Sequence, residues 1–205
     1  MHKLFKKAFK GLDTTDKKIL EIGCGNSVFL TYFKKDKVKG SVIHADAFKP
    51  PEDFLEKFDV VCSFGVVEHF EDTASTLKAF AKFLKPGGIL ISTLPNFKGA
   101  IGTLHKFLNK PVYDVHVPLG TDEMRDAIQK AGLKEEVNEY FLALSFAITL
   151  EGIDGKKIPY FKIKKIFVKT IRYASKIIWI LENFIGTMPA GKRFAGGIFT
   201  SARKL

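Results

Sequence analysis

The chain has 205 residues, 46% of them hydrophobic, which is enough for one domain with a sizeable core. Lys and Arg outnumber Asp and Glu by 33 to 22, so the net charge is +11. The two cysteines form no Cys-x-x-Cys pair, and Met1–Lys7 lacks the apolar run of a secretory signal. We therefore expect no bound metal, no disulfide framework and a cytoplasmic location. The sequence contains no run of 18 apolar residues, so it predicts no membrane-spanning helix.

The first informative segment pairs a short strand, 18–23, with a glycine-rich turn and a helix over 27–35. Glycines permit positive φ and close approach of a ligand, and a helix start offers unpaired N–H groups. This pattern predicts a nucleotide-type binding loop, formed by Gly23, Cys24, Gly25, Asn26 and Ser27 behind the acidic Glu21. A dinucleotide fingerprint would need a third glycine where Val28 stands, so it fits poorly.

Strands and helices alternate along the rest of the chain. The expected strands are 41–45, 59–63, 89–93, 135–141 and 197–202. The expected helices are 52–57, 73–84 with Asp72 or Thr73 as N-cap and Gly87 past its end, and 122–131 capped by Thr121. Such alternation predicts an α/β protein with a mostly parallel, doubly wound sheet and helices on both faces.

Three segments together resemble the class I S-adenosylmethionine-dependent methyltransferases (the type 11/12-like domain). They are the acidic-x-Gly-x-Gly loop at 21–27, the strand and turn at 57–70, and the Pro-Gly-Gly stop with its strand at 83–96. The resemblance covers roughly 17–141 and 196–204. It implies a Rossmann-like fold with an antiparallel last strand, S-adenosylmethionine as cofactor and S-adenosylhomocysteine as product.

One departure from that family lies before residue 57. The family places two strand–helix units between the glycine loop and the strand at 58–63, and only about one fits here. Either the unit is shortened, or a segment near 36–39 is missing from the sequence. The piece at 42–48 resembles the family's third strand, whose acidic end contacts the adenine amine. Asp46 also lies 21 residues after Gly25, near the distance of a ribose-binding acid.

The resemblance assigns cofactor contacts residue by residue. Glu21 would lie near the methionine ammonium, and its alternative role is to cap the loop's N–H groups. Asp46 would accept from the adenine amine or a ribose hydroxyl, with Ala47 beside it; an exposed loop residue is the alternative. Ligands bind beyond the carboxyl ends of parallel strands. The methyl-transfer face would therefore be lined by Ser63, Phe64 and Gly65.

Glu68 and His69 are the first candidates for catalysis, because they stand one turn beyond the strand at 59–63. Methyl transfer mainly needs positioning of the acceptor, and a base only where the acceptor must lose a proton. His69 has a suitable pKa range for that role, and a purely structural Glu-His pair is the alternative. His116, in the segment 110–118 where such enzymes often build the acceptor pocket, is the other candidate base.

The charge gathers in the last quarter of the chain, where 151–205 hold 12 Lys or Arg against 3 acidic residues. Five cations recur there at helical spacing beside an apolar stripe: Lys162, Lys165, Lys169, Arg172 and Lys176. They predict a basic amphipathic helix in an insert, 142–195, of a single domain, 1–205. Such a helix suits an anionic membrane surface. A helix packed on the sheet with solvated lysines is the alternative, and nucleic acid is a less favoured partner.

These observations lead to three functional hypotheses. The first is S-adenosylmethionine-dependent methyl transfer to a small-molecule or lipid-linked acceptor. The protein would then be cytoplasmic, and peripheral to a membrane if the basic helix binds one. The second is methylation of RNA or protein, which the basic last quarter would serve. The third is a catalytically degenerate methyltransferase fold that acts as a binding or scaffold protein.

Overall fold

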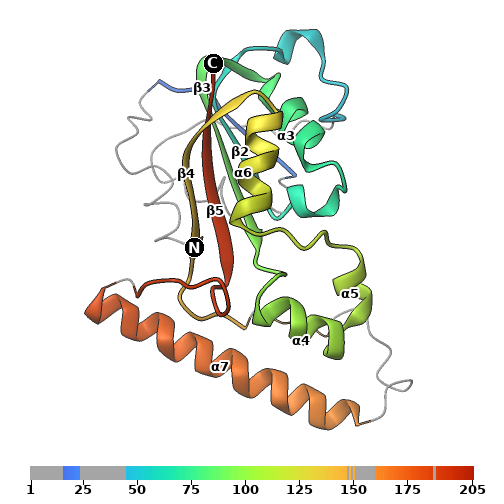
Figure 1. The fold of residues 1–205 in the computed structure, drawn as a ribbon, viewed down its shortest axis with the longest axis vertical. Coiled ribbons are helices and arrows are strands. Elements are labelled where there is room, and N and C mark those ends of the chain that lie inside the picture. The colour runs from blue at the N-terminus through green and yellow to red at the C-terminus, as the bar shows by residue number, and fades with distance from the viewer. Residues whose placement is uncertain (1–15, 24–44, 147, 149, 151–159, 187) are drawn as a thin grey trace.

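The computed structural model of the protein describes residues 16–23, 45–146, 148, 150, 160–186 and 188–205 (Figure 1). Several predictions fall outside these residues. They are the loop residues Cys24 to Ser27, the helix at 27–35, most of the strand at 41–45 and the shortened unit near 36–39.

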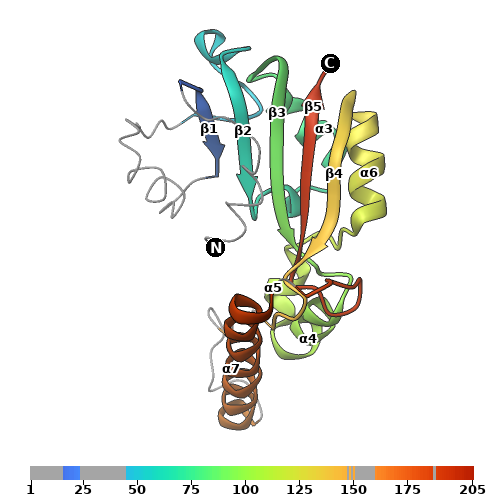
Figure 2. The same ribbon diagram turned by 90° about the vertical axis from the view of Figure 1, so that its left-hand side faces the viewer.

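Five strands form one mixed sheet in the order β1-β2-β3-β5-β4 (Figure 2). They are β1 (Ile19–Ile22), β2 (Phe58–Phe64), β3 (Leu84–Pro95), β4 (Leu133–Phe141) and β5 (Gly197–Lys204). The first three pair in parallel, whereas β5 runs antiparallel to both β3 and β4. The expectation of a mostly parallel sheet with an antiparallel last strand is confirmed. The carboxyl ends of β1, β2 and β3 therefore meet at one edge.

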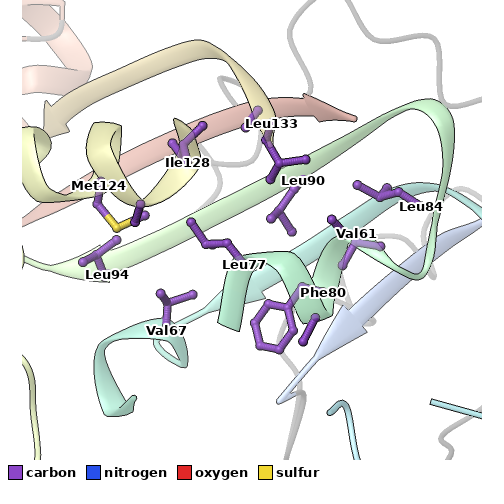
Figure 3. Close-up of a cluster of buried hydrophobic side chains, with 14 of the residues drawn as sticks. Val61, Val67, Leu77, Phe80, Leu84, Leu90, Leu94, Met124, Ile128 and Leu133 are labelled. Atoms are coloured by element: carbon purple, nitrogen blue, oxygen red, sulfur yellow. The ribbon is translucent and has the colours of Figure 1, made fainter. Parts of the chain in front are cut away.

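Helices α3 (Thr73–Ala81) and α6 (Thr121–Lys130) cover one face of the sheet. Their apolar sides form the main core against side chains from β2 and β3 (Figure 3). Phe80 is fully buried, as is Met124 on the neighbouring helix. The opposite face carries a second buried cluster that includes Val60, Cys62 and Ile91. The predicted helix 27–35 lies outside the described residues, so the expectation of helices on both faces stays a prediction.

Three of the predicted boundaries are wrong for local reasons. Helix α3 ends at Ala81, and Pro86 to Gly88 lie inside β3, where the register against β2 shifts. Gly87, with φ +76°, is therefore a turn within the strand and not a helix stop. The N-cap of α6 is Gly120 and not Thr121, and Glu123 Oε2 accepts from the Gly120 N–H at 2.9 Å.

The two remaining segments before β3 differ less from expectation. Residues 52–57 contain only a 3₁₀ turn, Glu52–Phe54, where a short helix was expected. At α3 the sequence left two N-cap candidates open, and the structure selects Asp72, whose Oδ1 accepts from the Ser75 N–H at 2.9 Å.

Three helices lie beyond the carboxyl end of β3: α4 (Ala100–Leu108), α5 (Lys110–Asp114) and α7 (Phe161–Ile185) (Figures 1 and 2). The sequence predicted α7 but neither α4 nor α5. The Ser175 hydroxyl of α7 accepts from the Phe146 N–H at 2.8 Å, which ties α7 to the segment after β4. Among the described residues, no helix is long and apolar enough to cross a membrane.

Candidate active site

The site is built where the neighbouring strands β1 and β2 end. Gly23 follows β1 with φ +76°, and Gly65 follows β2 with φ +70°. A Cβ at Gly23 would lie 2.4 Å from Cγ2 of Val66, so the two turns are in close contact and only glycine fits the first. The predicted ligand loop and the turn that leads to Glu68 are therefore direct neighbours.

Glu68 lies on a short 3₁₀ turn, Val67–His69, immediately after these glycine turns. Its side chain is only 2% exposed, and burial raises the pKa of its carboxyl to about 7. Oε2 of Glu68 has no hydrogen-bond partner among the described residues. A buried carboxylate oxygen without a partner is costly and calls for an explanation in terms of a ligand, an ion or a role in chemistry.

His69 and His116 lie beside this carboxylate, with ring centroids 4.4 Å apart. Nδ1 of His69 is 3.1 Å from the carbonyl oxygen of Val115, and Nδ1 of His116 is 2.5 Å from that of Val112. A carbonyl oxygen can only accept, so we assign the ring proton of each neutral imidazole to Nδ1. The lone pair of each Nε2 is then available to a ligand.

The segment after α5 brings His116 to this position. The Val117 N–H donates to the Glu68 carbonyl oxygen at 2.6 Å, which joins that segment to the 3₁₀ turn. Phe97, just after β3, stacks on the His116 ring with centroids 4.4 Å apart and planes at 9°. Burial lowers the pKa of His116, with a smaller contribution from His69, so its imidazole is held in the neutral form.

Sequence reasoning named Glu68, His69 and His116 as separate candidates, and the structure brings all three together. One oxygen or nitrogen atom from each side chain lies within 4.8 Å of the other two. Phe97 was missed. Its only sequence signal is an aromatic residue four positions after the end of the strand at 89–93, in the turn that follows the strand.

The predicted residues at the end of β2 point in two directions. Ser63 is fully buried, and its hydroxyl has no partner among the described residues. Phe64 packs instead against the second cluster, on the opposite face. The Gly65 N–H donates to the Thr93 carbonyl oxygen at 2.8 Å, which fixes the turn. The predicted roles of the three toward a cofactor stay predictions.

Asp46 and Glu21, the two acidic residues predicted to contact the cofactor, lie in different structural environments. Asp46 is exposed, and its Oδ1 accepts from the Phe48 N–H at 2.8 Å in a turn, while Ala47 packs against the main core. Glu21 is half-buried and pairs in register with Cys62. Burial, and to a smaller extent Glu21, raises the pKa of the Cys62 thiol, which marks it as an inert core residue.

The described residues fit an adenosylmethionine-type ligand at this edge. Two left-handed glycine turns lie at adjacent parallel strand ends, and the buried Ser63 hydroxyl beside them is unpartnered. Crevices of this kind, beyond the carboxyl ends of parallel strands, are where open α/β sheets bind ligands.

This sheet, with its glycine turn after β1 and antiparallel β5, defines a Rossmann-like class I methyltransferase fold. A profile described as a methyltransferase domain matches residues 1–138. The chain therefore belongs to this family, as a class I S-adenosylmethionine-dependent methyltransferase domain.

Solved structures and curated relatives agree with this assignment. A SAM-dependent methyltransferase from Archaeoglobus fulgidus superposes with a TM-score of 0.60 at 16% identity, over 99% of this chain and 93% of its own. One from Mesorhizobium loti gives 0.58 at 14% identity, over 98% and 97%. At such identities the likeness concerns the fold.

Among curated proteins, the chain is similar to two that are named ubiquinone biosynthesis O-methyltransferase. The protein from Cereibacter sphaeroides (strain ATCC 17029) is 38% identical over 86 residues, which are 38% of this chain and 35% of that protein. The one from Dinoroseobacter shibae is 30% identical over 158 residues, 62% of this chain and 61% of that protein. The matches thus span between about a third and three fifths of those relatives.

Proposed function

We propose that the protein transfers a methyl group from S-adenosylmethionine to a hydroxyl oxygen of a small, lipid-linked acceptor. The observation that carries the proposal is the cluster of Glu68, His69 and His116 directly beside the glycine turns. When bound, the cofactor supplies a sulfonium methyl group, so that the acceptor oxygen gains the methyl while the sulfur keeps the electron pair of the broken bond.

The residues of this chain then have two tasks. The turns at Gly23 and Gly65 would hold the cofactor against the end of β2, and Phe97 holds the His116 ring in place by stacking. A hydroxyl acceptor must lose its proton as the new bond forms. With the ring protons on Nδ1, the Nε2 atoms of His69 and His116 keep free lone pairs, which can bind the acceptor's hydroxyl group and draw off its proton.

A hydroxyl acceptor is favoured over other nucleophiles by the similar proteins, which are named O-methyltransferases. A lipid-linked acceptor is favoured by α7. Among the side chains of this helix that the structure describes, only Val168, Ser175 and Glu182, spaced one heptad apart, are buried. Most of its apolar side chains are exposed in the described structure: Ile163, Ile166, Phe167, Tyr173, Ile177, Ile180, Leu181, Phe184 and Ile185.

The exposed side of α7 has the layout of a helix that lies on a bilayer, and we propose an anionic membrane surface as its partner. At 3.6 residues per turn, the exposed apolar residues fall roughly opposite the buried stripe, and the cations fall along one flank. Lys165, Lys169, Arg172 and Lys176 line one groove of about 470 Å³, where lipid phosphates would find counter-charge. Ile171 and Ile178 are half-buried and do not belong to this exposed side.

Trp179 of α7 contacts the rest of the protein. Its indole N–H donates to the Leu144 carbonyl oxygen at 3.2 Å, and its side chain is 37% exposed. It therefore fastens α7 to the protein. Phe184, which is 83% exposed, is the better candidate for insertion between lipids.

The cofactor part of the proposal predicts that S-adenosylhomocysteine raises the melting temperature. A ligand that binds only the native state adds about 2.7 kcal/mol at 100 times its dissociation constant. Calorimetry should show saturable heat with one equivalent. A Gly23 substitution is a poor control, because any Cβ there collides with Val66 and strains the turn. Absence of both the heat and the shift would contradict cofactor binding and favour the scaffold hypothesis.

The acceptor part is tested with labelled S-adenosylmethionine and two phenols that differ only in an isoprenoid tail. We expect the methyl label on the hydroxyl oxygen of both, with a lower KM for the tailed phenol when anionic vesicles are present. Equal KM values would contradict the lipid-linked acceptor. Cofactor binding without label on any hydroxyl compound, but with label on RNA or protein, would favour the second hypothesis.

A further inference from the structure

We propose that Glu68, His69 and His116 bind a divalent transition-metal ion, with one coordination position left open for the acceptor oxygen. The absence of a Cys-x-x-Cys pair had argued against metal on cysteine spacing alone. Cysteine spacing gives no information about a site that is built from imidazole and carboxylate groups of segments far apart in the sequence.

The ligand atoms are ready for a cation. Oε2 of Glu68 is buried and has no partner among the described residues, and each imidazole turns a free Nε2 lone pair away from its Nδ1–H. Metal-binding histidines usually donate the second ring N–H to a carbonyl or carboxylate, which fixes the tautomer and the ring orientation. The Val115 and Val112 carbonyl oxygens supply that support here.

Only small side-chain rotations would bring the three ligand atoms to the spacing of a metal site. The three ligand atoms lie within 4.8 Å of one another. A tetrahedral zinc site with bonds of about 2.0–2.1 Å holds its ligand atoms about 3.3 Å apart. Glu68 is buried, His116 is half-buried and His69 is exposed, so a cation can enter from the His69 side.

The ligand chemistry selects the type of ion. Two imidazoles and one carboxylate suit Zn²⁺, Fe²⁺ or Mn²⁺, whereas Mg²⁺ and Ca²⁺ prefer sites made only of oxygen atoms. Three protein ligands are typical of a catalytic site that keeps one position free. With the ion bound, the Nε2 lone pairs are occupied, so an acceptor hydroxyl in the open position would release its proton to water instead of to His69 or His116, because the cation stabilises the oxygen anion. This role rests on the proposed function, while the metal site itself does not.

The test is a calorimetric titration of chelator-stripped protein with Zn²⁺, together with the visible spectrum after Co²⁺ substitution. We expect one equivalent of Zn²⁺ per chain and the intense absorption of four-coordinate Co²⁺. Glu68→Gln and His69→Gln should weaken Zn²⁺ binding by more than the roughly 10–100-fold that loss of an outer partner costs. Glu71→Gln removes an exposed carboxylate three residues from Glu68 and should change nothing.

His69 is exposed, so the His69→Gln variant keeps the test informative even if Glu68→Gln fails to fold. No saturable Zn²⁺ binding, or binding that survives both substitutions, would overturn the proposal. S-adenosylhomocysteine titrations of the same samples separate the two ideas. Zn²⁺ binding without cofactor binding refutes methyl transfer alone, and cofactor binding without saturable Zn²⁺ binding refutes the metal site alone.

Discussion

Replacing Lys162, Lys165, Lys169 and Lys176 with Gln should weaken binding to anionic vesicles by up to several hundredfold. Each basic residue near an anionic surface contributes about 1 kcal/mol, and these four lie on the flank of the exposed apolar side of α7. Vesicle co-sedimentation at low salt measures the effect. Binding of the wild-type protein should also fall as salt is added, because exposed charges are screened beyond about 10 Å at 0.1 M.

A matched control separates local charge from total charge. Lys78, Lys82, Lys130 and Lys134 are exposed on and near α3 and α6, away from α7 (Figure 1). Their replacement by Gln removes the same charge and should leave vesicle binding nearly intact. If both quadruple variants lose affinity equally, net charge and not α7 drives the binding. Wild-type protein that ignores anionic vesicles at low salt would refute the membrane proposal.

A third variant tests the apolar side of the same helix. Phe184→Ser removes an aromatic ring that is 83% exposed, so it should weaken vesicle binding without lowering the stability of the fold. A marked loss of stability would instead show that Phe184 packs within the protein.

Much of the sheet could be predicted from the sequence, because β1, β2 and the second half of β3 are short apolar runs. β1 ends at a glycine whose positive φ the turn requires, and β2 and β5 lie within one or two residues of their expected bounds. The start of β3 was missed because Pro86 and Gly87 usually end an element. Here the same residues form an irregularity inside a strand, which pairing with β2 on both sides stabilises.

The candidate site could be predicted only in part, because its geometry depends on long-range contacts. His69 and His116 lie 47 residues apart, and no local pattern places their rings 4.4 Å from each other. The contact depends on the Val117–Glu68 backbone hydrogen bond and on α4 and α5. These two helices were not predicted, although Asn109 as N-cap and Pro111 in the first turn of α5 are helix-start signals. Burial of Glu68 is likewise a property of the assembled fold.

That burial leads to the second large effect. In metal-free protein at pH 8, Glu68→Gln should raise the free energy of unfolding by about 3 kcal/mol. The pKa of the Glu68 carboxyl rises from 4.5 in an unperturbed carboxyl to about 7 in the fold, and each unit corresponds to about 1.4 kcal/mol. Above pH 7 the folded protein must hold a buried charge that the unfolded chain leaves in water.

The sign follows from proton binding. Between pH 4.5 and 7 the folded state binds the Glu68 proton more tightly than the unfolded state, so stability falls as the pH rises through this window. Glutamine has the same shape and no charge, so the variant loses this part of the pH dependence. Urea unfolding at pH 5 and pH 8, with a chelator present, measures both differences. The difference in the free energy of unfolding between wild-type and Glu68→Gln protein should be small at pH 5 and large at pH 8.

The exposed Glu71→Gln variant is the control and should follow the wild-type curve at both pH values. If wild-type and Glu68→Gln protein show the same pH dependence, the carboxylate is not buried as described. Adding Zn²⁺ at pH 8 should then recover stability in the wild-type protein and not in Glu68→Gln, because a bound cation offsets the buried charge that the variant lacks. The same carboxylate that destabilises the metal-free fold would in this way supply the driving force for binding the ion.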